Sequence, residues 1–277
     1  MLAGVDPQPW YDEAMTNWIL SERVGPVVVL TLNDPERANP LSSEMMDALH
    51  NSLAEATTDP AVRAVVLAAA GRHFSAGADL AALEEIARGG GEAENREDAK
   101  RLRRLFEELL GHPKLTVAAV HGAAVAGGCG LATACDLVVA EPAARFAYTE
   151  VKIGFLAAVV LTFLTRRVPG HIARRMLLDP EMITGERAVA IGLADELAAK
   201  GEALKTAVEL AQSVCRKSSG SALAATKALL NETVGLGWRD ALYAAAEANV
   251  RQRMDPECGR GVRAFLETKT TPDWLDE

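Results

Sequence analysis

Residues 121–140 read "HGAAVAGGCGLATACDLVVA", and positions 124–136 among them hold three glycines and four alanines. The preceding "LTVAAV" (115–120) is typical of a buried strand, and "LATACD" after the glycines indicates a helix. Glycine lets a backbone approach a ligand closely, and the first amides of a helix are unpaired and partly positive. The stretch therefore predicts a strand, a loop and the start of a helix. The amides at that helix start could bind a carbonyl oxygen that becomes negative. The glycines and alanines have a second explanation, because small residues also let a helix pack closely against a strand.

A second stretch has the same design. Residues 73–80, "HFSAGADL", place a loop of small residues after the strand predicted over 62–71. Asp79 stands where a helix N-cap is expected. Two such loops can each give one backbone N–H to a single oxygen, which is an oxyanion hole built without side chains. A phosphate site is disfavoured, because neither G-x-G-x-x-G nor a P-loop motif is present.

The flanking sequence predicts an α/β fold. Residues 18–34 indicate two strands joined by a turn at Gly25-Pro26, and residues 39–59 indicate a helix capped by Ser42 or Ser43. Strands and helices alternate to about residue 200, with the special loops at strand ends. The polar stretch 89–98 is predicted to be a loop, since it has no apolar anchor.

Helical patterns alone continue from about residue 201, without strand signals. We therefore divide the chain into an N-terminal tail (1–15), an α/β core (16–200) and a helical C-terminal region (201–277). Such a helical region commonly covers an active site or forms a subunit interface.

Composition argues against several classes of protein. The chain has 277 residues, of which 49% are hydrophobic and 24% charged, as in ordinary globular proteins. Its net charge of −9 disfavours binding to nucleic acid or to an anionic membrane, and the basic cluster at 100–106 is expected to be a solvated helix face. The apolar run 155–164 is too short to span a bilayer.

The cysteines and the N-terminus indicate a reducing, cytoplasmic location. Residues 1–15 lack the basic and apolar regions of a signal peptide. The four cysteines are not spaced as metal ligands, so no metal site is expected. Cys129 and Cys135 lie in apolar surroundings and are expected to be buried free thiols.

Four blocks together carry a family resemblance: "HFSAGADL", "HGAAVAGGCGLATACDLVVA", "ARFAYTEVKIGF" and "ITGERAVAIGLADEL". They resemble the signature blocks of the enoyl-CoA hydratase/isomerase family, the crotonase superfamily, and the match runs from about residue 16 to 270. The resemblance implies a crotonase-like spiral of ββα units with a helical C-terminal trimerisation region. It also implies a homotrimer or a dimer of trimers that acts on acyl-CoA thioesters. Coenzyme A is then part of the substrate, and no separate cofactor is expected.

The same resemblance assigns the site. The oxyanion hole falls on the amides of Ala78 and Gly127. The implied substrate-binding residues are Arg37, Ala38, Ala76, Ala78, Asp79, Leu80, Ala81, Gly130 and Phe155. Hydratases of the family typically carry two glutamates; the first position is Gly130 here, and the second is Glu150 in "YTEVKIG". We expect Glu150 to be the general acid/base, with a pKa raised by an apolar pocket.

Gly130 leaves several functions open. The first is an enoyl-CoA hydratase of fatty acid β-oxidation, which adds water to a trans-2-enoyl-CoA to give a 3-hydroxyacyl-CoA. The second is a Δ3,Δ2-enoyl-CoA isomerase, which needs only one base, and the third is a non-catalytic acyl-CoA binder. Glu84 or Glu85 could replace the missing acid, although both fit a solvated helix face better.

Other polar residues near the loops are expected to support the scaffold. "FLAAVV" (155–160) replaces the Pro-Gly-Gly-rich loop of many hydratases, which indicates a drier pocket. Asp79 is expected to cap a helix, and Asp136 to order the turn into the next strand. His73 and His121 flank the two loops without a triad partner, so we expect hydrogen-bonded scaffold histidines.

Overall fold

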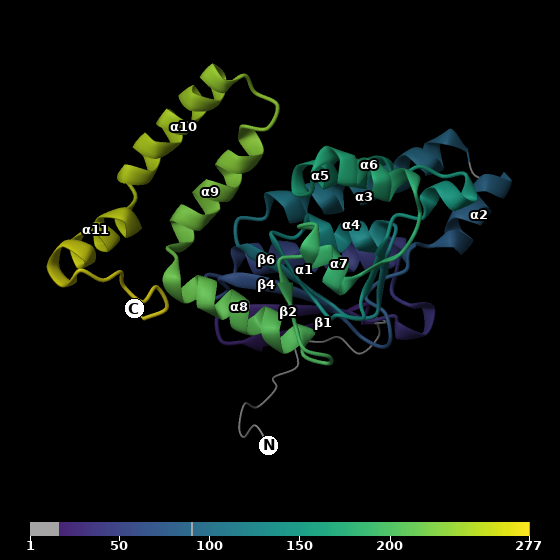
Figure 1. Cartoon of the computed structure of the whole chain (residues 1–277), viewed down its shortest axis with the longest axis horizontal. Coiled ribbons are helices and arrows are strands. Elements are labelled where there is room, and N and C mark those ends of the chain that lie inside the picture. Colours follow the sequence, from purple (N-terminus) through teal and green to yellow (C-terminus); the bar gives the residue numbers. More distant parts are fainter. Residues whose placement is uncertain (1–16, 90, 277) are drawn as a thin grey trace.

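A computed structural model describes residues 17–89 and 91–276 (Figure 1), so the predicted tail 1–15 lies outside the described residues. Its centre is a six-stranded sheet with the order β1-β2-β4-β6-β8-β11. The first two strands form the predicted antiparallel hairpin, and all others run parallel to β2. The strands are β1 (Ile19–Val24), β2 (Val27–Leu32), β4 (Ala64–Ala69), β6 (Leu115–Val120), β8 (Leu137–Ala140) and β11 (Glu196–Leu197).

The predicted spiral of ββα units is present. In each turn a strand of the large sheet is followed by a short strand of a second layer and then by a helix. The three turns are β4–β5–α2, β6–β7–α4 and β8–β9–α5, with β5 (Gly77–Ala78), α2 (Leu80–Gly89), β7 (Ala123–Val125), α4 (Gly127–Ala134), β9 (Arg145–Ala147) and α5 (Ala158–Arg167). The short strands pair as β10-β9-β7 and β3-β5, with β10 (Ile183–Thr184) and β3 (Pro40–Leu41). The loops that follow β4 and β6 meet through an isolated parallel bridge between Ser75 and Ala124.

The large sheet is buried on both faces. Side chains alternate along a strand, so Val28 and Leu30 point into one core and Val27 and Val29 into the other. The first core is closed by α4 and α5 together with α1 (Ser43–Thr58), α3 (Glu92–Gly111), α6 (Gly170–Leu178) and α7 (Gly185–Ala190). The second core is closed by α8 (Ala203–Lys217), which lies across the opposite face (Figure 1). Ser42 caps α1 as predicted, because its Oγ accepts from the Met45 amide at 3.2 Å.

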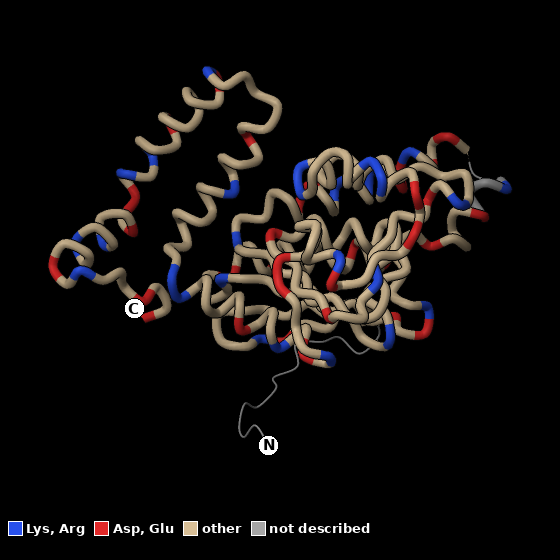
Figure 2. Tube along the Cα trace, viewed as in Figure 1, with Lys and Arg blue, Asp and Glu red and all other residues tan. Residues whose placement is uncertain are grey.

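The prediction of a loop over 89–98 is wrong at Gly89, which ends α2, and over 92–98, because α3 begins at Glu92. Acidic residues Glu92 and Glu94 in its first turn favour the helix dipole, and Glu92 pairs with Arg96 one turn later. The basic cluster 100–106 continues this helix, and acidic residues of α3 and α1 partner its cations: Lys100–Glu97, Arg101–Asp47 and Arg103–Glu107. Figure 2 shows both signs interspersed there.

The last three helices extend away from the sheet (Figure 1). They are α9 (Gly220–Glu232), α10 (Trp238–Arg253) and α11 (Pro256–Thr268), and none contains a buried residue. Large apolar side chains stay exposed on them, among them Trp238, Leu242, Tyr243, Val250 and Phe265.

Candidate active site

The structure brings the two predicted loop amides together. A Cβ added to Gly77 would lie 2.9 Å from the Gly127 nitrogen, and one added to Gly127 would lie 3.8 Å from the Ala78 nitrogen. Gly77 has φ +86°, a conformation that glycine adopts without strain. Gly127 is the first residue of α4, so its N–H has no acceptor within the helix. The amides of Ala78 and Gly127 are thus neighbours, and the glycines at 77 and 127 add no side chain of their own there.

Buried Ser75 fastens one loop to the other. Its Oγ donates to the Asn39 carbonyl at 2.7 Å and accepts from the Gly77 amide at 3.2 Å. Its backbone bonds to the second loop through Ala123 O at 3.1 Å and the Val125 amide at 2.9 Å. The geometry of Gly77 is therefore fixed from three directions.

Asn39 is a site-supporting residue that our sequence analysis missed. It is fully buried with φ +52°, and its Nδ2 donates to the carbonyls of Ala70 and His73, both at 2.9 Å. Asparagine tolerates this left-handed conformation better than most residues, which was the available signal in "RANPL".

The start of α4 is strained. Ala126 has φ 50° and ψ −124°, a region that favours glycine. Its amide donates to the Ala147 carbonyl at 2.8 Å, and its own carbonyl accepts from the Gly130 amide at 3.0 Å. These bonds hold the N-terminus of α4 against the end of β9, three residues before Glu150.

Glu150 is buried at the start of the 3-10 helix η2 (Glu150–Ile153), with 8% of its surface exposed. Its Oε2 has no hydrogen-bond partner among the described residues. Burial raises the pKa of this carboxyl above its ordinary value. Burial also raises the pKa of the Cys129 thiol, in the first turn of α4, to about 12, and the charge of Glu150 contributes to that rise. Glu150 is thus a proton-carrying group with a free oxygen.

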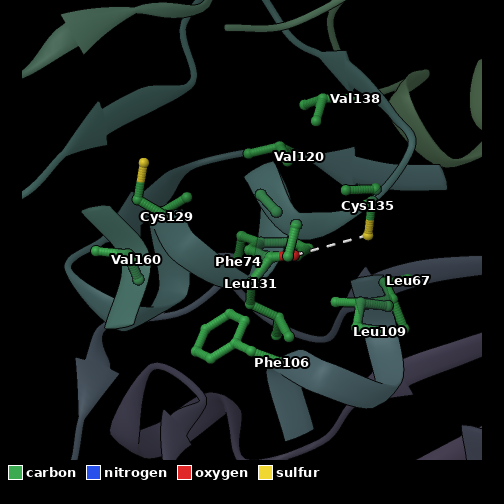
Figure 3. Packing of buried hydrophobic residues seen from close by; sticks show 14 of the residues in the cluster. Leu67, Phe74, Phe106, Leu109, Val120, Cys129, Leu131, Cys135, Val138 and Val160 are labelled. Atoms are coloured by element: carbon green, nitrogen blue, oxygen red, sulfur yellow. Dashed lines mark hydrogen bonds between the residues drawn. The ribbon is translucent and has the colours of Figure 1, made fainter. Parts of the chain in front are cut away.

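The position of Gly130 has no room for a carboxylate. A Cβ there would lie 2.2 Å from Val160 Cγ1 and 3.2 Å from Phe106 Cζ. Figure 3 shows Val160 and Phe106 against the helix that carries Cys129 and Leu131. Phe106 also packs on Phe163, with ring centroids 5.2 Å apart. Apolar side chains of α3 and α5 therefore fill the space beside Gly130.

Of the two alternative acids, Glu84 does not replace it. The Glu84 side chain is 62% exposed and pairs with Arg88 at 2.5 Å. Glu85 belongs to α2, but its side chain lies outside the described part of the chain. The solvated helix face is therefore confirmed for Glu84.

The predicted coenzyme A residues lie around the first loop. Arg37, 48% exposed, pairs with Asp79 and lies 3.5 Å from Asp34. Asp79 caps α2 as predicted, accepting from the amides of Ala81 at 3.1 Å and Ala82 at 3.4 Å. Burial alone would raise the Asp79 pKa, but the hydrogen bond from Arg37 and those from the helix amides outweigh it and lower the pKa.

Of the remaining predicted substrate-binding residues, some contact the first loop and others are exposed to solvent. Ala38 lies beside the first loop, because its carbonyl accepts from the Ala76 amide at 2.8 Å. Leu80 and Phe155 expose 59% and 51% of their surface, and Ala81 is also exposed. Phe155 is tied to the acid, since its amide donates to the Glu150 carbonyl at 3.0 Å.

The scaffold roles predicted for three polar residues are confirmed. His73 Nδ1 accepts from the Ala123 amide at 3.3 Å, and His121 Nε2 donates to the Gly71 carbonyl at 3.0 Å. Asp136 Oδ2 accepts from the Thr116 amide at 2.7 Å and from Lys227 Nζ at 2.6 Å, which orders the entry into β8.

Other features of the described residues do not compete with this site. Within 17–89 and 91–276, no group of three or more His, Cys, Asp or Glu side chains is arranged to hold a metal ion, and no helix is long and apolar enough to cross a bilayer. A cavity of about 270 Å³ lies at the other end of α4, beside Asp136, Arg166 and Lys227. It is remote from the two amides, so we place the candidate site at the loops instead.

Comparisons with known proteins agree with this geometry. The family model "Enoyl-CoA hydratase/isomerase" matches residues 22–277. A Thermus thermophilus protein named "Putative enoyl-CoA hydratase" is 47% identical over 88% of this chain and 96% of its own length. The "2,3-dehydroadipyl-CoA hydratase" of Escherichia coli is 32% identical over 90% and 94%, respectively. The crystal structure of an enoyl-CoA hydratase from Mycobacterium smegmatis superposes with a TM-score of 0.85 at 32% identity, covering 93% of this chain and 98% of that one.

The spiral fold, the adjacent loop amides and these matches over nearly the whole described chain lead to one conclusion: the chain belongs to the enoyl-CoA hydratase/isomerase family.

Proposed function

We propose that this chain is an enoyl-CoA hydratase that works with a single carboxylate, Glu150, and converts a trans-2-enoyl-CoA into a 3-hydroxyacyl-CoA. One observation carries the proposal: Glu150 is a buried carboxyl whose Oε2 has no partner among the described residues, and it follows by three residues the Ala147 carbonyl that binds the Ala126 amide beside the two adjacent loop amides. Relatives named as hydratases support it.

In this mechanism the amides of Ala78 and Gly127 donate to the thioester oxygen of the substrate. They stabilise the negative charge that develops there as the enolate forms. Ionised Glu150 takes a proton from a water molecule while the water oxygen adds to Cβ. The protonated carboxyl then delivers that proton to Cα, which collapses the enolate and restores the carboxylate.

The closed space beside Gly130 favours a second candidate, Δ3,Δ2-enoyl-CoA isomerisation. Val160 and Phe106 occupy the region where a second acid would hold water. Glu150 alone could take the Cα proton of a 3-enoyl-CoA and return it to Cγ, which moves the double bond next to the thioester. The same two amides would hold the dienolate oxygen.

A product assay separates the candidates. Hydration removes the conjugated enoyl absorbance of crotonyl-CoA, whereas isomerisation of trans-3-hexenoyl-CoA creates it. We expect turnover of crotonyl-CoA; turnover of trans-3-hexenoyl-CoA alone would assign the isomerase. If neither substrate reacts while calorimetry shows acyl-CoA binding, the chain is a non-catalytic binder.

The activity should depend on pH through Glu150. The carboxylate must be ionised to accept a proton, and burial raises its pKa above the ordinary 4.5. We therefore expect kcat/KM to fall as the pH is lowered through a value above 4.5. A rate–pH profile in a constant-ionic-strength buffer measures this. An acidic limb at or below 4.5 would contradict the assignment.

We also propose that α9, α10 and α11 bind further copies of the chain, giving a homotrimer or a dimer of trimers. Their exposed apolar side chains exceed what scattered surface residues explain. Sedimentation should give three or six times the chain mass of 29.4 kDa. Val250→Asp should shift the protein towards monomers, whereas Asn249→Asp adds the same charge beside it and should not. A wild-type monomer would refute the assembly.

A further inference from the structure

A buried hydrogen-bond chain links the two halves of the candidate site. The Tyr148 hydroxyl lies 2.9 Å from Thr133 Oγ1, and both side chains are buried. Thr133 Oγ1 also lies 2.9 Å from the Cys129 carbonyl and 3.2 Å from the Gly130 carbonyl. Tyr148 precedes Glu150 by two residues, and Thr133 belongs to α4, the helix that begins with the Gly127 amide.

Either hydroxyl can be the donor in this bond. A carbonyl oxygen can only accept, so Thr133 gives its single proton either to a carbonyl of its own helix or to the Tyr148 oxygen. Tyr148 donates to Thr133 in the first case and accepts from it in the second, and the two side chains are joined in both. Burial raises the pKa of the Tyr148 phenol far above its ordinary value, so the phenol stays protonated near neutral pH.

We propose that Tyr148 and Thr133 are positioning residues, which fix the segment carrying Glu150 at the correct distance from the helix carrying the Gly127 amide. This inference rests on the proposed function, since it assigns Glu150 to proton transfer. The β7–β9 ladder, which pairs Val125 with Ala147, and the backbone bond from Ala126 to the Ala147 carbonyl join the two segments at the end of the strands. The side-chain bond joins them again six residues beyond Gly127 along α4, so it resists a tilt of the segment after β9 relative to the helix.

The position of a proton-transfer group matters because catalysis requires reacting atoms in a near-attack geometry. A misplacement of ~1 Å can cost about 100-fold in rate. Neither Tyr148 nor Thr133 needs to touch the substrate for this effect. Loss of their bond should therefore lower kcat and leave KM unchanged.

The test uses Tyr148→Phe and Thr133→Val, each of which removes one hydroxyl and keeps the shape of the side chain. The readout is exchange of the Cα protons of butyryl-CoA in D2O, followed by NMR, together with steady-state kcat and KM. Exchange needs only the two amides and Glu150. We expect each variant to slow exchange and lower kcat by about 10-fold, with unchanged KM, within the range that misplacement explains.

Two comparisons distinguish positioning from a structural role. The double variant should be no slower than either single variant, because both remove the same bond, and Thr133→Ser should retain wild-type rates. Thr116→Val removes another buried hydroxyl, bonded to Asp136 beyond the far end of α4, and should leave kcat unchanged.

The outcomes separate the two proposals. Wild-type exchange that Glu150→Gln abolishes supports the proposed function. Unchanged kcat in folded Tyr148→Phe and Thr133→Val would then overturn the positioning role alone, as would additive losses in the double variant. A wild-type chain that neither exchanges nor turns over would overturn both.

Discussion

Glu150→Gln is expected to lower kcat by about 10³-fold, within the range of ~10²–10⁴ that general acid–base catalysis contributes. The amide side chain keeps the shape of Glu150 but cannot carry the proton. KM should change little, because the thioester oxygen still meets the amides of Ala78 and Gly127. Steady-state kinetics with crotonyl-CoA and acyl-CoA affinity by calorimetry measure the two effects separately.

The same substitution should make the fold more stable near neutral pH. The pKa of Glu150 is raised by burial, so the folded chain binds this proton more tightly than the unfolded chain does. That contribution is complete below the unfolded pKa and is lost as the pH rises through the folded pKa. Glutamine cannot ionise, so Tm should exceed that of wild type near neutral pH and match it at about pH 4, below the ordinary pKa of glutamate.

Glu84→Gln is the matched control, because Glu84 is exposed and pairs only with Arg88. It should change neither kcat nor the pH dependence of Tm. Full activity in folded Glu150→Gln would remove Glu150 from the mechanism. Unchanged Tm across pH would show that its carboxyl is solvated rather than buried.

Gly77→Ala is expected to lower kcat by about 10²–10³-fold, the loss that follows removal of one oxyanion donor. The added Cβ would lie 2.6 Å from the Val125 carbonyl and 2.9 Å from the Gly127 nitrogen. Both contacts force the loops apart, and the separation of the Ala78 and Gly127 amides must change. The positive φ of Gly77 adds strain to the same loop.

Gly192→Ala controls for backbone strain. Gly192 also has positive φ, but an added Cβ there meets nothing within 4 Å. We expect it to lower Tm without lowering kcat. If Gly77→Ala is folded by circular dichroism and retains wild-type kcat, the loop amides do not form the oxyanion hole.

The sequence predicted the parts of the site that local chemistry determines. The glycine loops follow buried strands, so their meeting could be predicted once parallel pairing was assumed. Asp79 stands at the start of a helical pattern and proved to be its cap. The absence of a carboxylate at Gly130 was predicted from the family resemblance rather than from local chemistry.

The reason for that absence was not visible. Val160, which fills the space beside Gly130, lies on α5, 30 positions later in the chain. Phe106, which also reaches that space, lies on α3, 24 positions earlier in the chain. Such contacts depend on how α3 and α5 pack, which no local pattern encodes. The bond between Tyr148 and Thr133 was missed for the same reason.

One prediction made from local sequence was wrong. Residues 92–98 carry no apolar stripe, so a loop was predicted. The helix dipole and pairs such as Glu92–Arg96 make that segment the exposed first turns of α3 instead. A polar stretch continuous with an anchored helix can be helical without burying anything itself.

Because α9, α10 and α11 contain no buried residue, we expect them to affect how long a newly made chain resists proteolysis. Helices of 13 to 16 residues are marginal in water unless they pack against something. In the proposed assembly, a copy without its partners should therefore fray from its C-terminal end first, and proteases should cut it there. The dilution at which such cutting begins would then set the lowest cellular abundance at which the protein persists.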